Sequence, residues 1–234
     1  MNSNLFSFRH FAVALLLTTF LFAGSALAGP PLICHPFDIG NAKSLPWISH
    51  SWNLTGSESY DIKNLSADTI AILDSDSTVL VHMETLRRAA LYAQNDHDTA
   101  KHLLLKLLAR SDAANNSPQA ALASFDLGYY AEALNQLHWI NKSASNPAQG
   151  FDGFALVKKA IQLRGDDPQM DFAAALITLN GPAADHSNYA QKTFAGAKND
   201  PLLARNLSLR FINPQSETMA DIISRTPNVK VAQQ

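Results

Sequence analysis

The pattern of apolar and polar positions predicts a series of α-helices from about residue 65 to residue 212. In the first long helix, which we expect to start at Asp76 or Ser77, apolar residues recur every three or four positions. That spacing places them on one face of a helix. They are Val79, Met83, Leu86, Ala90 and Ala93. The next predicted helix, Asp98 to Arg110, is apolar over so much of its surface that we expect it at the centre of the fold.

Capping residues and prolines predict where other helices begin. Ser117 precedes Pro118, and proline is favoured at the first helical position after a capping serine. Two Asp-Pro pairs, at 167–168 and 200–201, each open a further helix. These two helices are predicted over residues 169–179 and 202–211. The remaining predicted helices cover residues 66–73, 154–164 and 187–198, with an irregular unit around 142–165. The predicted fold class is all-α.

Two stretches separated by 33 residues share a pattern. The first contains Asn95, His97, Ala100 and Leu104, and the second contains Gly128, Tyr130, Ala133 and Leu137. Asn and Gly accept the positive φ that a tight turn between helices needs. The small alanines let two helices approach each other closely. The pattern therefore predicts two antiparallel helical hairpins in tandem, with turns at Asn95 and at Gly128.

The second stretch resembles the tetratricopeptide repeat, whose period is about 34 residues and whose second helix opens with G-x-Y-x-x-A. Gly128, Tyr130 and Ala133 match that opening, whereas Arg87 and Arg88 stand where the family has Leu and Gly. The closing proline of the family is absent from both units. The resemblance implies a tetratricopeptide-like α-solenoid in which the first helix of each pair lines a concave, peptide-holding surface.

The first 28 residues have the pattern of an export signal. Arg9 gives a positive start, residues 11–22 are apolar except for two threonines, and Ala26-Leu27-Ala28 is a small-x-small cleavage site. The apolar run is too short to span a bilayer. We expect export to the periplasm or the extracellular space, with a mature chain that starts at Gly29 and has no membrane span. The alternative is a retained membrane anchor.

Residues 29–64 differ from the rest of the chain. Four prolines, Gly40, Gly56, Trp47 and Trp52 interrupt any helical period. We expect an extended lead-in whose aromatic rings lie along the first helices and cover the open end of the array. After the array (65–212), we expect a short helix at 217–224 and a flexible tail to residue 234.

Composition narrows the class of partner. Charged residues make up only 16% of the chain, the formal net charge is −2, and no basic stripe appears. Nucleic acid is therefore not an expected partner. Apolar residues make up 47% of the chain, which suits closely packed helices.

The only cysteine, Cys34, is followed by His35. One interpretation is an enzyme or a metal site centred on Cys34, His35 and Asp38, which His50 or His82 would complete. Adjacent side chains in an extended segment point to opposite sides, so His35 is poorly placed to activate Cys34. A buried thiol, or a thiol paired between two chains, is the alternative. No hydrolase, phosphate-binding or zinc-protease motif occurs, and we expect no cofactor.

The polar cluster Arg87, Arg88 and Tyr92 is the candidate partner-binding site. In a tetratricopeptide-like array these residues would contribute to the concave surface and bind an acidic or C-terminal segment. The alternative is a solvated helix face on which Glu84 pairs with Arg88 four residues later.

Three functions follow from these observations. The first is an exported, non-catalytic interaction or scaffold module that binds a peptide or an envelope protein, and this role is implied by the resemblance alone. The second is the enzyme or metal-binding protein that uses Cys34 and His35. The third is a structural homodimer in which a second copy completes the apolar helix at 98–110.

Overall fold

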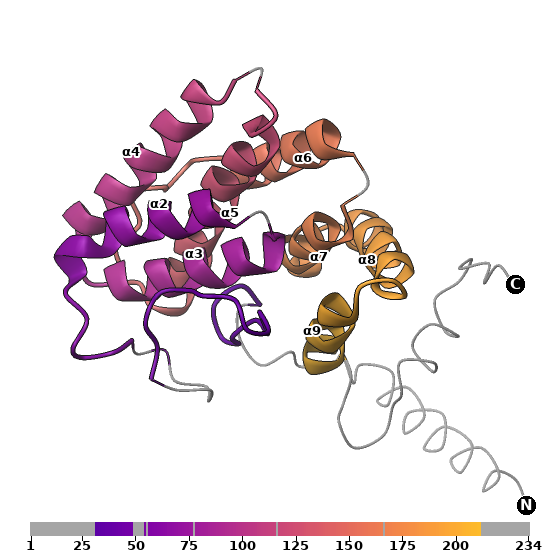
Figure 1. Ribbon diagram of the computed structural model, residues 1–234, viewed down its shortest axis with the longest axis horizontal. Helices are drawn as coiled ribbons and strands as arrows, with labels where there is room; N and C mark the ends of the chain where they lie inside the picture. The colour runs from indigo at the N-terminus through magenta and orange to yellow at the C-terminus, as the bar shows by residue number, and fades with distance from the viewer. Residues whose placement is uncertain are drawn as a thin grey trace, which may run out of the picture.

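Figure 1 shows the computed structural model, which describes residues 31–48, 54, 56–76, 78–115, 117–165 and 167–211. Within these residues the chain forms eight α-helices and two short 3-10 helices, with no strand, and the all-α prediction is confirmed there. The predicted signal peptide and the predicted helix at 217–224 lie outside the described residues. The elements are η1 (Ile62–Asn64), α2 (Leu65–Ser75), α3 (Val79–Ala93), α4 (His97–Ala113), α5 (Ala120–Ile140), α6 (Gly153–Arg164), α7 (Pro168–Ile177), η2 (Thr178–Asn180), α8 (Ala183–Ala197) and α9 (Pro201–Phe211).

Helix α5 is the central element. It is 21 residues long, about 31 Å, and it packs against α3, α4, α6 and α7. Helix α2 covers α3 and α4, whereas α7 and α8 form a second pair that α9 follows. Figure 1 shows α2 to α6 gathered together, with α7, α8 and α9 continuing from them. No helix in the described part of the chain is both long and apolar enough to cross a membrane.

Helix α4 lies at the edge of the fold, and its predicted central position is wrong. One face buries Ala100, Leu103 and Leu107 against its neighbours. The opposite face leaves Leu105 52% exposed and Leu108 37% exposed. The apolar surface of this helix is therefore wider than the surface that the fold covers.

The second predicted hairpin is also wrong, because Gly128 lies inside α5 and forms no turn. The first hairpin is present: α3 and α4 are joined by a short turn in which the Asp96 N–H donates to the Ala93 carbonyl. A Cβ atom on Gly128 would lie 2.5 Å from the backbone oxygen of Gly153, and a Cβ on Gly153 would lie 2.5 Å from the Gly128 oxygen. The two glycines therefore let α5 and α6 meet backbone to backbone.

Aspartate caps fix three helix starts. Asp167 accepts hydrogen bonds from the N–H groups of residues 169 and 170, and α7 starts at Pro168. Asp200 accepts from the Leu203 N–H at 2.9 Å, and α9 starts at Pro201. Asp152 caps α6 in the same way. By contrast, α5 begins two residues after Pro118, because residues 118 and 119 form a turn.

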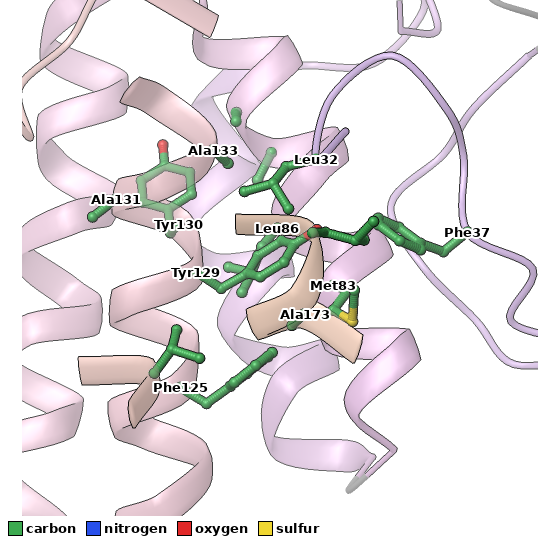
Figure 2. Close-up of a cluster of buried hydrophobic side chains, with 14 of the residues drawn as sticks. Leu32, Phe37, Met83, Leu86, Phe125, Tyr129, Tyr130, Ala131, Ala133 and Ala173 are labelled. Atoms are coloured by element: carbon green, nitrogen blue, oxygen red, sulfur yellow. The ribbon is translucent and has the colours of Figure 1, made fainter. Parts of the chain in front are cut away.

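The core surrounds the aromatic side chains of α5. The Phe125 and Tyr129 rings stack with centroids 5.6 Å apart, and Tyr129 is fully buried. Figure 2 shows Leu32 and Phe37, which come from the chain before η1 and α2, among these side chains. The core is therefore completed by residues that precede every helix in the described part of the chain.

The glycine contact between α5 and α6 yields a prediction about stability. Helix propensity alone would make Gly128→Ala more stable by about 1 kcal/mol. We expect instead a fall of about 2 kcal/mol in the free energy of unfolding, because the new Cβ would overlap the Gly153 carbonyl. Urea unfolding measures the change. The exposed Ala109→Gly is the control, with a loss of about 1 kcal/mol from propensity alone. A stabilised Gly128→Ala variant would contradict the close contact.

Candidate functional site

Residues 31–47, called here the N-terminal segment, lie against helix α3 without forming a helix or a strand. Four side chains of α3 bind main-chain atoms of the segment: Glu84, Arg87, Arg88 and Tyr92. Arg87 and Arg88 follow Glu84 by three and four residues, and Tyr92 follows Arg88 by four. This spacing places them in one stripe on the helix. The sequence of α3 thus presents two cations, a carboxylate and a phenol to the same stretch of chain.

The stripe binds main-chain atoms of the segment. The Phe37 N–H donates to Glu84 Oε2 at 2.9 Å, and Arg87 Nε donates to the His35 carbonyl at 3.0 Å. Arg88 Nη1 donates to the Leu45 carbonyl, and the Tyr92 hydroxyl donates to the carbonyl of residue 46. These bonds do not depend on the identity of the segment's side chains.

Aromatic contacts hold the end of the segment. The Trp47 ring lies 5.3 Å from the Arg87 guanidinium carbon and 5.9 Å from that of Arg88. Its edge meets the Tyr92 ring at 5.6 Å. Tyr92 in turn accepts a hydrogen bond from the Ser57 N–H, and a Cβ on Gly56 would lie 2.1 Å from its ring. Tyr92 is therefore enclosed by the chain on both sides of Trp47.

Helices α5 and α9 complete the contact. The Leu32 N–H donates to Gln136 Oε1 at 2.9 Å. Asn206 binds both main-chain groups of Asp38: the Asp38 N–H donates to Asn206 Oδ1 at 2.9 Å, and Asn206 Nδ2 donates to the Asp38 carbonyl at 2.8 Å. The Asp38 carboxylate lies 2.7 Å from Arg205 Nε. We call seven of the side chains that bind the segment the clamp. They are Glu84, Arg87, Arg88, Tyr92, Gln136, Arg205 and Asn206.

The segment also buries apolar side chains. Leu32, Ile33 and Leu45 are fully buried and Phe37 is 3% exposed. The Phe37 ring meets the edge of Phe172 on α7 at 6.0 Å. Each such side chain contributes about 1.5–3 kcal/mol of hydrophobic stabilisation, so the segment is an integral part of the folded chain.

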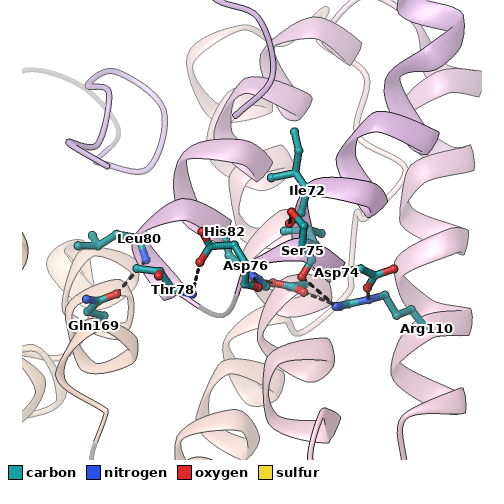
Figure 3. Close-up of polar contacts among 11 residues, drawn as sticks. Ile72, Asp74, Ser75, Asp76, Thr78, Leu80, His82, Arg110 and Gln169 are labelled. Atoms are coloured by element: carbon teal, nitrogen blue, oxygen red, sulfur yellow. Dashed lines mark hydrogen bonds and ion pairs between the residues drawn. The ribbon is translucent and has the colours of Figure 1, made fainter. Parts of the chain in front are cut away.

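Helix α9 is held in place relative to α3 by Gln169, which Figure 3 shows beside Leu80. The Leu80 N–H at the start of α3 donates to Gln169 Oε1 at 3.0 Å. Gln169 Nε2 donates to Asp200 Oδ2 at 2.6 Å, just before α9. This bridge ties the starts of α3, α7 and α9 together, and it thereby places Asn206 over the segment.

The clamp charges on α3 are largely removed from water. Glu84 is fully buried, with Oε1 2.7 Å from Arg88 Nε and 3.7 Å from Arg87 Nη1. Burial lowers the pKa of the Arg87 guanidinium, and the charge of Glu84 opposes that effect. Hydrogen bonds from Arg205 and from the Gly40 N–H hold the pKa of the Asp38 carboxyl below its ordinary value.

The predicted site residues Arg87, Arg88 and Tyr92 do gather on one surface, and the chain's own N-terminal segment occupies that surface. Of the alternative, the Glu84–Arg88 pair is present, but the solvated helix face is wrong, because Glu84 is buried and Arg87 is only 1% exposed. The reason is that the segment covers this face of α3. The sequence pattern identified these residues and placed the lead-in along the first helices, but it did not predict that the two bind each other.

The residues of the alternative enzyme or metal centre have other contacts. Cys34 is partly buried and lies within electrostatic range of Arg87, which also binds the His35 carbonyl. Asp38 pairs with Arg205, and both ring nitrogens of His82 have partners in a separate network. His50 lies outside the described residues. Over the residues that are described, no group of three or more His, Cys, Asp and Glu side chains is arranged to hold a metal ion.

That separate network, part of which Figure 3 shows, joins four helices and was not predicted from the sequence. His82 Nδ1 lies 2.6 Å from Asp126 Oδ1, and His82 Nε2 lies 2.9 Å from the Asp76 carbonyl. Arg110 Nη1 donates to Asp126 Oδ2 at 2.6 Å and its Nε donates to Asp74 at 2.9 Å. The available signal was Asp126, a carboxylate within an otherwise apolar stretch, which needs a partner when buried.

The network sets the charge of the buried histidine. Burial alone would lower the pKa of the His82 imidazole, and the nearby Arg110 charge acts in the same direction. The charge and the hydrogen bond of Asp126 outweigh both effects and raise that pKa above its ordinary value. The protonated imidazole therefore stabilises the folded chain.

The clamp carboxylate yields a stability prediction. Glu84→Gln keeps the size of the side chain but leaves Arg87 and Arg88 without their buried counter-charge. We expect the free energy of unfolding to fall by about 3 kcal/mol in urea denaturation. Glu58→Gln, the same chemical change at an exposed position, is the control and should shift stability by less than about 0.5 kcal/mol. Equal effects of the two substitutions would show that the Glu84 charge does not hold the segment.

The histidine network yields a pH prediction. Because the folded-state pKa of His82 is raised, its contribution is complete below the unfolded value of about 6.5 and is lost as pH rises through the folded-state pKa. The difference in unfolding free energy between wild type and His82→Gln should therefore shrink as pH rises above about 6.5. The exposed His102→Gln is the control, with a small difference of less than about 0.5 kcal/mol. A wild-type advantage that grows with pH would contradict the assignment.

Comparison of the chain with known protein families, curated proteins and solved structures finds no match. The resemblance to the tetratricopeptide repeat stays a prediction, and the continuous helix α5 replaces the hairpin that the repeat would place there. The clamp and the segment that it binds are the features of the molecule from which a function can be argued.

Proposed function

We propose that the protein is a non-catalytic interaction module that uses the clamp to bind an extended segment of a protein partner. The observation that supports this proposal is that the clamp forms hydrogen bonds with main-chain atoms of the segment. Side chains of α3, α5 and α9 bind N–H or C=O groups at six positions of a segment that has no regular structure.

This mode of contact suits the recognition of polypeptide. Main-chain hydrogen bonds supply affinity for any extended chain, and pockets for selected side chains supply specificity. The Asn206 amide matches the N–H and C=O of a single residue, as a neighbouring strand would. The buried positions of Leu32 and Phe37 are the matching pockets.

We place this activity in the periplasm or the extracellular space, on the pattern of residues 1–28. Cleavage after Ala28 would leave a mature chain that begins two residues before the described N-terminal segment. The clamp would then hold the first part of the mature chain.

A structural homodimer is the second candidate function, and one observation favours it. Leu105 and Leu108 lie one turn apart on the outer face of α4 and are exposed. A second copy that covered this face would bury both side chains. Mass measured in solution, under reducing and non-reducing conditions, distinguishes a dimer through α4 from a dimer through Cys34 and from a monomer.

A peptide-exchange experiment tests the clamp as a binding site. A site for a specific protease is inserted between residues 49 and 53 of the mature chain, which is then cleaved. We expect the N-terminal fragment to stay bound and to exchange with a fluorescent synthetic peptide of residues 31–48, measured by anisotropy. Arg88→Gln with Tyr92→Phe removes two main-chain contacts and should weaken peptide binding by at least about tenfold.

The control for this experiment is Lys101→Gln with Lys106→Gln on the exposed face of α4. It should bind the peptide as the unsubstituted protein does. Absence of exchange, or equal binding by the clamp variant and the control, would refute the clamp as a polypeptide-binding site.

A further inference from the structure

The N-terminal segment occupies the clamp in a sequence-specific way. Its aliphatic pair, Leu32 and Ile33, is fully buried, and Phe37 four residues later reaches α7. Figure 2 shows Leu32 and Phe37 pointing into the cluster around Tyr129 and Met83. Residues between these anchors, such as His35, contribute a main-chain carbonyl. The segment therefore binds through side chains at two places and through its backbone between them.

The acidic residue that follows Phe37 is recognised as well. Asn206, which is fully buried, binds the main chain of Asp38, and Arg205 binds its carboxylate. The Gly40 N–H also donates to that carboxylate, in a turn where Gly40 has φ +62°. A positive φ is most easily adopted by glycine. The recognised pattern is thus aliphatic-aliphatic-x-x-x-Phe-acid.

We infer that residues 31–47 are a tethered competitor, which a partner segment of this same pattern must displace before it binds. The inference rests on the proposed function of the clamp. The partner is a protein chain that presents an aliphatic pair, a phenylalanine four residues after the pair, and an Asp or Glu next to the phenylalanine. In the absence of that partner the chain occupies its own binding site.

Tethering sets the strength of the competition. A segment joined to the body by a short connection has an effective concentration of about millimolar at its own site. A free peptide of the same sequence must exceed that concentration to displace it. The intact chain should therefore bind the peptide weakly. Removal of a buried side chain of the tethered segment should make the site available to the peptide.

The test measures binding of the fluorescent 31–48 peptide to the intact mature chain by anisotropy. Phe37→Ala in the protein removes the aromatic anchor of the tethered segment but leaves the clamp unchanged. We expect it to bind the peptide at least about 100-fold more tightly than wild type does. Ile48→Ala is the matched control, because it also truncates an apolar side chain but one that is 68% exposed. It should bind the peptide as weakly as wild type.

The cleaved protein, in which the tether is cut without any substitution, serves as a reference in case Phe37→Ala impairs folding. Cleaved protein that binds the peptide no more tightly than the intact chain would overturn tethered competition. A second combination of results would also overturn tethered competition: the cleaved protein exchanges the peptide, but a folded Phe37→Ala chain binds the peptide no better than wild type does. That combination would leave the proposed function intact. No binding by either protein would remove the proposed function as well.

Variant peptides test the pattern. A peptide with Phe37→Ala should bind the cleaved protein at least about 100-fold more weakly, and one with Asp38→Asn a few-fold more weakly. A peptide with Lys43→Ala, at an exposed position, should bind unchanged. Equal affinities for all the peptides would show that the clamp recognises only the main chain. That result would refute the sequence pattern proposed for the partner.

Discussion

The structure depends on the buried carboxylate of Glu84. It accepts a hydrogen bond from the Phe37 N–H, and its other oxygen pairs with Arg88 and lies 3.7 Å from Arg87. A charge that is removed from water is costly unless it is paired and hydrogen-bonded. The N-terminal segment supplies one of those hydrogen bonds and also excludes the water. The side chains of α3 and the position of the segment are therefore coupled, because the Glu84 carboxylate and the main chain of the segment supply hydrogen-bond partners to each other.

The rest of the molecule positions partners for this contact. The glycine pair at 128 and 153 brings α6 against α5, and α5 carries Gln136 to the start of the segment. Gln169 links the starts of α3 and α9, and α9 carries Asn206 to Asp38. Helices that are distant in the sequence thus meet on one stretch, residues 31–47, that forms neither helix nor strand. This arrangement is what makes a polypeptide-binding role physically reasonable.

Local signals in the sequence predicted the helical class and several helix starts, because caps such as Asp167 act within one turn. They also singled out Arg87, Arg88 and Tyr92 as one surface, because a stripe depends only on helical spacing. They failed where contacts are long-range. A glycine such as Gly128 is compatible with a turn between helices and also with a close contact between two helices. Only the position of Gly153, which is distant in the sequence, shows that the second case applies. Similarly, the separation of 44 positions between His82 and Asp126 gave no sign of their pairing. The lead-in was expected along the first helices, but nothing local indicated that its main chain would bind Glu84, Arg87 and Arg88.

Hydrogen exchange by NMR tests most directly whether the segment fills the clamp. The N–H groups of Leu32, Phe37 and Asp38 donate to side chains of Gln136, Glu84 and Asn206, so their exchange reports on these contacts. A docked segment predicts that the three amides exchange slowly, at rates similar to those of amides in the middle of α3. Exchange of the three at the rate of an unstructured peptide, with α3 still protected, would contradict the account.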